Sequence, residues 1–164
     1  MSEFRRHVMG AAATLALLAP AEAGSAQEAI AFPEGYRSWH HVKSMLIEEG
    51  HPLFADFGGL HHVYANDVAR RGYETGSFED GSVIVFDLLA VERTADNAVV
   101  EKERKVLAVM VRDSARFAAT GGWGYEAWAG GDPAKPVVGE KAAEACHACH
   151  EQAAPDYVFS EWRP

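Results

Sequence analysis

The residues of this sequence best suited to chemistry lie near its C-terminal end, in Cys146-His147-Ala148-Cys149-His150. Two cysteines separated by two residues and followed by a histidine form the pattern by which haem c is attached to proteins. On a helix both thiols project from one face, so they can form thioether bonds with the two vinyl groups of one haem edge. The adjacent His150 is then placed to coordinate the iron. We therefore predict one covalently bound haem c per chain, with Cys146, Cys149 and His150 as its attachment residues.

Two other kinds of site share this cysteine spacing. A thioredoxin-like redox dithiol usually follows a strand of a βαβ unit, whereas these cysteines lie in a predicted C-terminal helix. A zinc site requires two further ligands, and His147 is poorly placed for this role beside Cys146. Covalent haem is therefore the favoured interpretation. Since the sequence has only two cysteines, it would leave neither a disulfide nor a free thiol.

No local pattern assigns the second axial position of the iron. An electron-transfer cytochrome usually has two strong axial ligands, either His with Met or His with His. The candidate side chains are Met45, Met110, His40, His41, His51, His61 and His62. Each histidine is more simply explained as a surface or hydrogen-bonded residue, and Met110 as part of a core strand. The residues alone therefore leave the iron five- or six-coordinate.

Composition limits the class of protein. The chain has 164 residues, of which 48% are hydrophobic, and a formal net charge of −9. This length suits one domain with its own core, and the apolar content excludes intrinsic disorder. The acidic balance argues against nucleic acid and anionic membranes as main partners, because their phosphates require clustered Lys and Arg.

Residues 1–26 have the organisation of a secretory signal peptide. A short basic stretch precedes an apolar stretch at residues 8–18, which is too short to span a bilayer, and small residues up to Ala26 offer cleavage sites. The alternative is an N-terminal membrane anchor that is not cleaved. We predict export to the periplasm, with residues 27–164 as a single haem-binding domain that does not insert into a membrane.

The rest of the chain combines strand patterns with a few helical ones. Strands are expected at residues 61–64, 82–91, 106–111 and 123–129, and helices at residues 39–47, 67–73 and 140–153. The stretch at 82–91 is apolar on both faces, which predicts a central strand. The expected fold class is α+β: a mostly antiparallel β-sheet with peripheral helices and a C-terminal haem-attachment helix.

Four stretches carry a family resemblance: residues 36–39 (YRSW), 75–81 (TGSFEDG), 144–150 (EACHACH) and 156–159 (DYVF). With a single haem motif at the end of a β-rich chain, residues 33–163 resemble the cytochrome P-460 and cytochrome c′-beta family. The resemblance implies an exported homodimer with a largely antiparallel β fold. It also implies one pentacoordinate haem per subunit, bound through the histidine of the motif. Finally, it implies an extended backbone around Trp39, where the apolar spacing predicts a helix.

The resemblance also separates two branches of this family. In cytochrome P-460 a lysine is covalently joined to the haem, and a distal carboxylate assists the oxidation of hydroxylamine. Phe86 occupies the lysine position here, and residues 105–110 supply no carboxylate where the oxidising relatives have one. Both differences favour the cytochrome c′-beta branch, in which two phenylalanines cap the distal face of the haem. Phe86 matches one cap, and Phe57 matches the second, with Phe54 as its rival.

The resemblance thus implies a protein that binds small gases, chiefly nitric oxide (NO) and also CO, for sensing, transport or detoxification, rather than an enzyme. An aromatic cap offers no hydrogen-bond donor, which disfavours bound O₂ relative to NO and CO. The first alternative is an oxidoreductase acting on hydroxylamine or NO, for which Lys105 or Lys43 would have to supply the crosslink. The second alternative is a six-coordinate cytochrome that transfers electrons to a redox partner protein.

Overall fold

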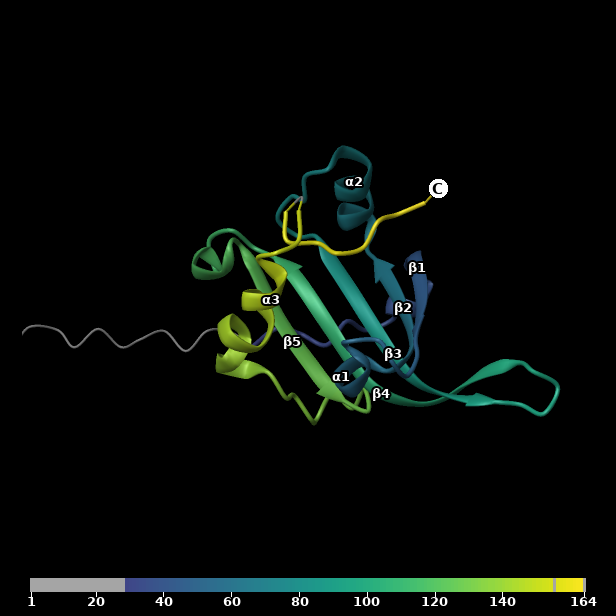
Figure 1. Ribbon diagram of the computed structural model, residues 1–164. Helices are drawn as coiled ribbons and strands as arrows, with labels where there is room; N and C mark the ends of the chain where they lie inside the picture. Colours follow the sequence, from purple (N-terminus) through teal and green to yellow (C-terminus); the bar gives the residue numbers. More distant parts are fainter. Residues whose placement is uncertain (1–28, 155, 164) are drawn as a thin grey trace, which may run out of the picture.

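A five-stranded antiparallel sheet forms the centre of the fold (Figure 1). The computed structural model describes residues 29–154 and 156–163, so the predicted signal peptide at residues 1–26 lies outside the described residues. The spatial order of the strands is their order in the chain: β1 (His40–Ile47), β2 (Gly59–Ala65), β3 (Val83–Arg93), β4 (Val99–Arg112) and β5 (Trp123–Ala129). The α+β class with a mostly antiparallel sheet is confirmed, and β3 is the central strand, as its two-sided apolar pattern predicts.

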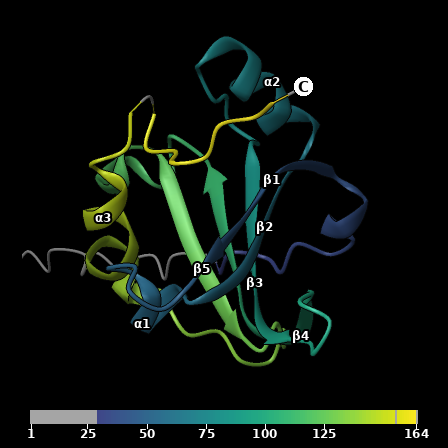
Figure 2. The same ribbon diagram turned by 45° about the vertical axis from the view of Figure 1, so that its right-hand side comes forward.

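Short helices connect the strands (Figure 2). They are η1 (Tyr36–Ser38), α1 (Phe54–Phe57), α2 (Asp67–Thr75), η2 (Ala118–Thr120), η3 (Gly139–Lys141), the π-helical η4 (Ala143–His147) and α3 (Ala148–His150). The helix expected at residues 140–153 is therefore a succession of three helical types that ends at His150. No helix among the described residues is long and apolar enough to cross a membrane.

Helix α2 has the end signals that the sequence predicts. The side chain of Asn66 accepts a hydrogen bond from the backbone N–H of Ala69, which caps the first turn. Gly76 follows the last turn with φ of 78°, in the left-handed region that favours glycine at a helix end. Two local signals were thus sufficient to place this helix.

The predicted helix at residues 39–47 is wrong, because this segment forms strand β1 and pairs antiparallel with β2. The pairing register shifts between His41 and Lys43, as in a β-bulge, and this shift disturbs the alternation of apolar and polar residues. Trp39 packs on one side of the sheet and Val42 on the other. The helical spacing of these apolar residues therefore reflects a bulged strand that serves two cores, and the extended backbone implied by the family resemblance is confirmed.

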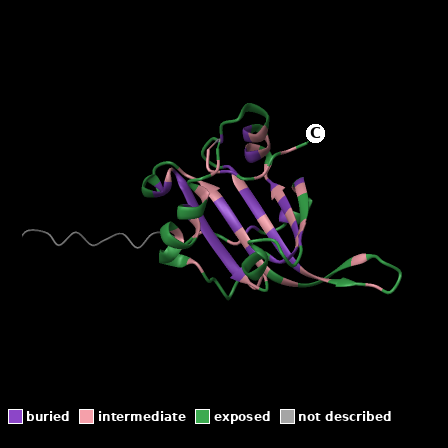
Figure 3. Cartoon of the chain, in the orientation of Figure 1, coloured by how far each residue is buried: buried purple, intermediate pink, exposed green. Residues whose placement is uncertain are grey.

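The sheet has an apolar cluster on each face. On one face Val63, Ile84, Met110 and Tyr125 pack with Val158 and Cys146 from the C-terminal segment, and we call it the C-terminal face. The opposite face carries Val85, Leu107, Val109 and Trp128, which pack with residues that precede β1. Beyond these clusters, strands β3 and β4 continue as a hairpin that extends away from the sheet and is largely exposed (Figure 3). Strand β4 is consequently longer than the stretch expected at residues 106–111.

Candidate functional site

The two cysteines of the motif lie on the helical segment that covers the C-terminal face. Cys146 is half-buried and packs against the apolar cluster, whereas Cys149 is exposed. Neither forms a disulfide within the described part of the chain. Burial raises the pKa of the Cys146 thiol, and the nearby Glu126 and Cys149 raise it further. The two sulfur atoms lie within one helical turn, as attachment to one haem edge requires.

The imidazole of His150 is held in an orientation suited to a metal ligand. Its Nδ1 donates a hydrogen bond to the carbonyl oxygen of Tyr157 at 2.8 Å, and Nε2 has no hydrogen-bond partner among the described residues. The rings of Tyr125 and Phe159 flank it, each with its centroid 5.1 Å from that of His150. Burial lowers the pKa of His150. The imidazole is thus neutral, with the Nε2 lone pair free for iron.

Phe86 lies on the C-terminal face, two residue positions along the strands from the level of Tyr125. Phe86 on β3 is paired with Ala108 on β4 and through it with Ala127 on β5, whereas Tyr125 is paired with Met110. The ring of Phe57, at the end of α1, meets the ring of Phe86 edge-on, with a centroid distance of 6.0 Å and an interplanar angle of 88°. The structure thus brings the two predicted cap residues together.

Phe54, the rival for the second cap, lies in a groove beside α1. This groove is lined by Gly58, Lys105 and the base of the β3–β4 hairpin. The ring contact with Phe86 is made by Phe57 instead, which favours Phe57 as the second cap.

Exposed aromatic side chains on this side of the molecule fit a large apolar ligand. Phe57 is 41% exposed, and Phe159, which touches His150, is 57% exposed. Exposed apolar surface of this kind is characteristic of a ligand or interaction site. A porphyrin attached to the motif would cover such rings. The residues present therefore fit a haem c.

His61 connects the two cap residues. Its ring lies 4.6 Å from that of Phe86, measured between centroids, and its Nε2 donates to the carbonyl oxygen of Phe57 at 2.5 Å. The side chain is buried, and Nδ1 has no partner among the described residues. Burial lowers its pKa, with a smaller lowering from Lys105. His61, one of the candidate axial ligands, thus contacts both caps.

The other candidate axial ligands lie in ordinary structural contacts. Met110 is buried in the apolar cluster, and Met45 is exposed. The histidines form hydrogen bonds with near neighbours: His40 with Asp67, His41 and His62 with Ser44, His62 also with Glu101, and His51 with the backbone of Leu53. These contacts agree with the simpler explanation of each residue as a surface or hydrogen-bonded side chain.

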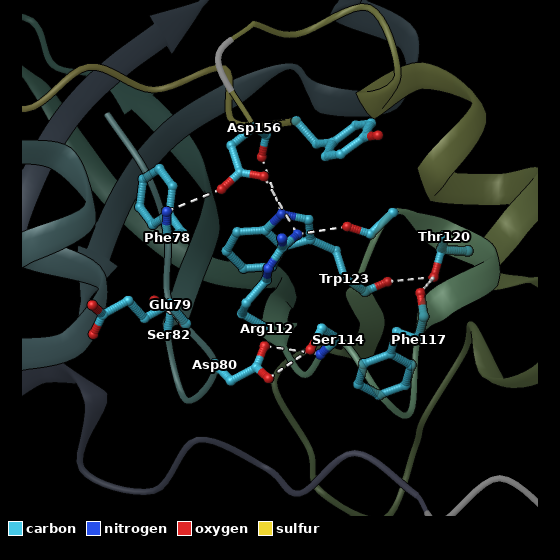
Figure 4. A network of polar contacts seen from close by, with 12 residues as sticks. Phe78, Glu79, Asp80, Ser82, Arg112, Ser114, Phe117, Thr120, Trp123 and Asp156 are labelled. Carbon is cyan, nitrogen blue, oxygen red and sulfur yellow. Dashed lines mark hydrogen bonds and ion pairs between the residues drawn. The ribbon is translucent and has the colours of Figure 1, made fainter. Parts of the chain in front are cut away.

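Two acidic residues at the site, Glu126 and Asp156, were not predicted to have a role there. Glu126 is buried on β5 and accepts hydrogen bonds from the backbone N–H groups of Ala127, Val138 and Gly139, so it holds the chain that leads into η3. Asp156 joins the C-terminal segment to the sheet through several polar contacts (Figure 4). A pattern search for haem ligands overlooks such residues, because they act on the backbone around the motif.

Comparison of the sequence with known proteins yields one family. The model of the family described as Cytochrome P460 matches residues 33–160, which is more than half of the chain. A comparison with curated proteins gives no match.

Proposed function

Because the chain belongs to the cytochrome P460 family, whose members are haem c proteins, we propose that Cys146 and Cys149 form the thioether bonds to its haem and that His150 coordinates the iron. The free Nε2 of His150 and the thiols one helical turn apart support this assignment. The haem would supply an iron able to bind small diatomic ligands.

We propose further that the protein belongs to the cytochrome c′-beta branch. In this proposal it binds NO and is not an oxidoreductase that acts on hydroxylamine or NO. The observation that carries this proposal is the edge-on contact between Phe57 and Phe86. Two phenyl rings in contact on the C-terminal face give an entering ligand an apolar, crowded environment. Such an environment favours small neutral gases over anions, because an anion loses hydration without gaining a partner.

The imidazole of His61, which contacts both cap residues, does not offer a donor to a ligand. The Nε2–H of His61 is used by the carbonyl oxygen of Phe57, and the remaining Nδ1 of the neutral ring can only accept a hydrogen bond. Bound O₂ carries negative charge and gains stability from hydrogen-bond donors, whereas NO and CO depend on them less. The His61 ring therefore gives a bound ligand no hydrogen bond, which supports discrimination against O₂.

One spectroscopic experiment tests this proposal. The absorption spectrum of the ferrous protein is recorded alone, with NO and with CO. Gas binding by a pentacoordinate iron predicts a high-spin spectrum that changes on addition of either gas. A low-spin six-coordinate spectrum that does not respond would indicate the electron carrier instead. Steady turnover of hydroxylamine would contradict the non-enzymatic assignment.

A specific contact keeps the oxidoreductase as a second candidate. The Nζ of Lys105 donates to the carbonyl oxygen of Gly58, the residue after Phe57, at 2.8 Å. A lysine therefore lies beside the predicted cap, although it comes from β4 and not from the lysine position of the family. A haem joined to Lys105 predicts a third covalent link. Mass spectrometry of haem-bearing peptides detects it, and the gas-binding proposal requires that only the two thioether links are found.

Export and dimerisation form a separate part of the proposal. Family members are typically exported, and we propose that residues 1–26 direct the chain to the periplasm and are then removed. We also propose a homodimer. N-terminal sequencing of the protein from the periplasmic fraction tests the first point, and sedimentation equilibrium tests the second.

A further inference from the structure

The backbone takes an uncommon conformation just after the haem motif. Asp156 and Tyr157 have φ angles of 56° and 67°, so two consecutive residues other than glycine lie in the left-handed region. Side chains disfavour this region, and such a pair persists only where the surrounding structure holds it. Strained backbone of this kind is often found where a functional group must be placed accurately.

Contacts of Asp156 with three separate parts of the sheet region hold this turn (Figure 4). One carboxylate oxygen accepts a hydrogen bond from the backbone N–H of Phe78 at 3.0 Å, and the other lies 3.3 Å from the guanidinium of Arg112. The main-chain carbonyl of Asp156 accepts a hydrogen bond from the indole of Trp123 at 3.0 Å. Arg112 is itself fixed by the carbonyl oxygen of Gly121 and by the Trp123 ring, 5.4 Å away. Asp156 is thus anchored to the loop before β3, the end of β4 and the start of β5.

The residue after this anchor supplies the hydrogen bond to the proximal histidine. The carbonyl oxygen of Tyr157 accepts from Nδ1 of His150 at 2.8 Å. The direction of this carbonyl is set by the backbone angles of the Asp156–Tyr157 turn. The contacts therefore run in an unbroken chain from the sheet through Asp156 and the Tyr157 carbonyl to the His150 ring.

We propose that Asp156 is a positioning residue for His150, acting through the carbonyl of Tyr157. This inference rests on the proposed role of His150 as the iron ligand. The carbonyl keeps the proton of His150 on Nδ1 and the lone pair on Nε2, and it fixes the rotation of the ring. Hydrogen-bond partners of metal-bound histidines orient the ring and make it a stronger donor to the metal. Loss of the Asp156 anchor therefore weakens the bond between His150 and the iron.

The test compares Asp156→Ala with Asp80→Ala in the haem-loaded protein. Asp80 is a suitable control because its carboxylate also fixes a nearby loop, through the N–H and hydroxyl of Ser114, and makes no hydrogen bond to Asp156, Tyr157 or His150 among the described residues (Figure 4). The readout is the iron–histidine stretching band of the ferrous protein in resonance Raman spectra. Asp156→Ala lowers and broadens this band, whereas Asp80→Ala leaves it in place even if both variants unfold at a lower temperature.

Further variants complete the test. Asp156→Asn retains an acceptor for the Phe78 N–H and a side chain that tolerates positive φ but loses the ion pair with Arg112, so its band lies between those of Asp156→Ala and the wild type. The Raman band is measured without NO, so it tests Asp156 even where NO binding itself fails. An Asp156→Ala band identical to that of Asp80→Ala would overturn the proposal. If Asp156→Ala does not accumulate, Arg112→Lys removes part of the same anchor and must shift the band in the same direction.

Discussion

The imidazole of His61 packs edge-on against the ring of Phe86, with the two ring centroids 4.6 Å apart. The same imidazole holds the carbonyl oxygen of Phe57, so one buried histidine on β2 contacts both residues of the proposed cap. The Phe57 ring belongs to a helix of only four residues, which has little stability of its own. His61 thus provides the support that keeps the two rings in contact.

Substitution of Phe86 by alanine should open the distal side to ligands. The variant removes one ring of the cap and the edge-on contact that restrains the other ring. We expect the CO association rate of the ferrous protein to rise about tenfold, which corresponds to a barrier lower by about 1.4 kcal/mol. Flash photolysis of the CO complex measures this rate.

Phe32→Ala is the matched control for this variant. Phe32 is a partly buried phenylalanine of the opposite face, where its ring packs on Trp128 at 5.0 Å. Its loss should lower stability without changing the CO association rate. Equal rates for Phe86→Ala and the wild type would contradict the assignment of Phe86 to the cap.

The buried imidazole of His61 should make stability depend on pH. Its pKa is lowered from 6.5 because burial penalises the charged ring. Below pH 6.5 the unfolded chain therefore takes up a proton that the folded protein does not. The free energy of unfolding falls as the pH drops from 6.5 to the folded pKa, by at most about 1.4 kcal/mol per pH unit, and above pH 6.5 this contribution is constant.

His61→Gln removes this titration while keeping an amide N–H for the Phe57 carbonyl. Urea unfolding of both proteins between pH 8 and pH 5 (about one unit per step) measures the difference. The stability of the wild type should decline relative to the variant only on the acid side. Parallel curves over the whole range would show that His61 is not held neutral by the fold.

Much of the fold could be predicted from local sequence signals. Helix α2 has a capping asparagine and a terminal glycine, and β5 was predicted with its observed bounds because it is apolar and lies between glycine pairs. Strand β1 was misread as a helix, since its bulge and its two-sided burial are set by pairing with β2. The charged first half of β4, residues 99–105, was not predicted as a strand, because its strand structure comes from pairing with β3 in an exposed hairpin.

The candidate site also contains some residues that the sequence predicts and others that only the structure reveals. The motif of Cys146, Cys149 and His150 can be recognised from the sequence alone, because haem attachment requires those side chains in that order. The choice of Phe57 over Phe54 needed the ring contact with Phe86. The partner of His150 is a backbone carbonyl, which every residue possesses. Its anchor, Asp156, contacts the N–H of Phe78, a residue 78 positions away. No local pattern encodes such contacts.

A buried ion pair on the opposite face should dominate the stability of the central strands. Asp87 is fully buried and accepts hydrogen bonds from the guanidinium of Arg104 and from the hydroxyl of Tyr36 at 2.6 Å. Burial and the hydrogen bond to Asp87 raise the pKa of Tyr36, so this hydroxyl remains a donor. Asp87→Asn leaves the Arg104 charge without its partner. We expect a loss of about 3 kcal/mol in urea unfolding.

The exposed pair of Asp132 and Lys135, 3.0 Å apart, provides the comparison. Asp132→Asn should cost much less than Asp87→Asn, because an exposed pair is screened by water. Similar losses for the two variants would mean that burial does not strengthen the Asp87 contacts.

Glu126 should control how efficiently haem is attached. Its carboxylate receives the N–H groups of Val138 and Gly139, and so fixes the chain shortly before the helical segment that presents Cys146. Glu126→Ala leaves these donors without a protein partner, which should lower the stability of this loop. A mobile segment presents the two thiols less often in a common orientation. We therefore expect a lower haem-loaded fraction by intact mass, together with a lower midpoint of thermal unfolding.

Two further variants separate this effect from a general loss of charge near the motif. Glu126→Gln keeps a side-chain oxygen that can accept the N–H of Val138, so its haem-loaded fraction should lie between those of Glu126→Ala and the wild type. Glu144→Ala removes an exposed carboxylate from η4 itself and should leave haem loading unchanged. If Glu126→Ala and Glu144→Ala load haem equally well, the loop contacts of Glu126 do not govern attachment. Glu126 would then have only a structural role in the sheet.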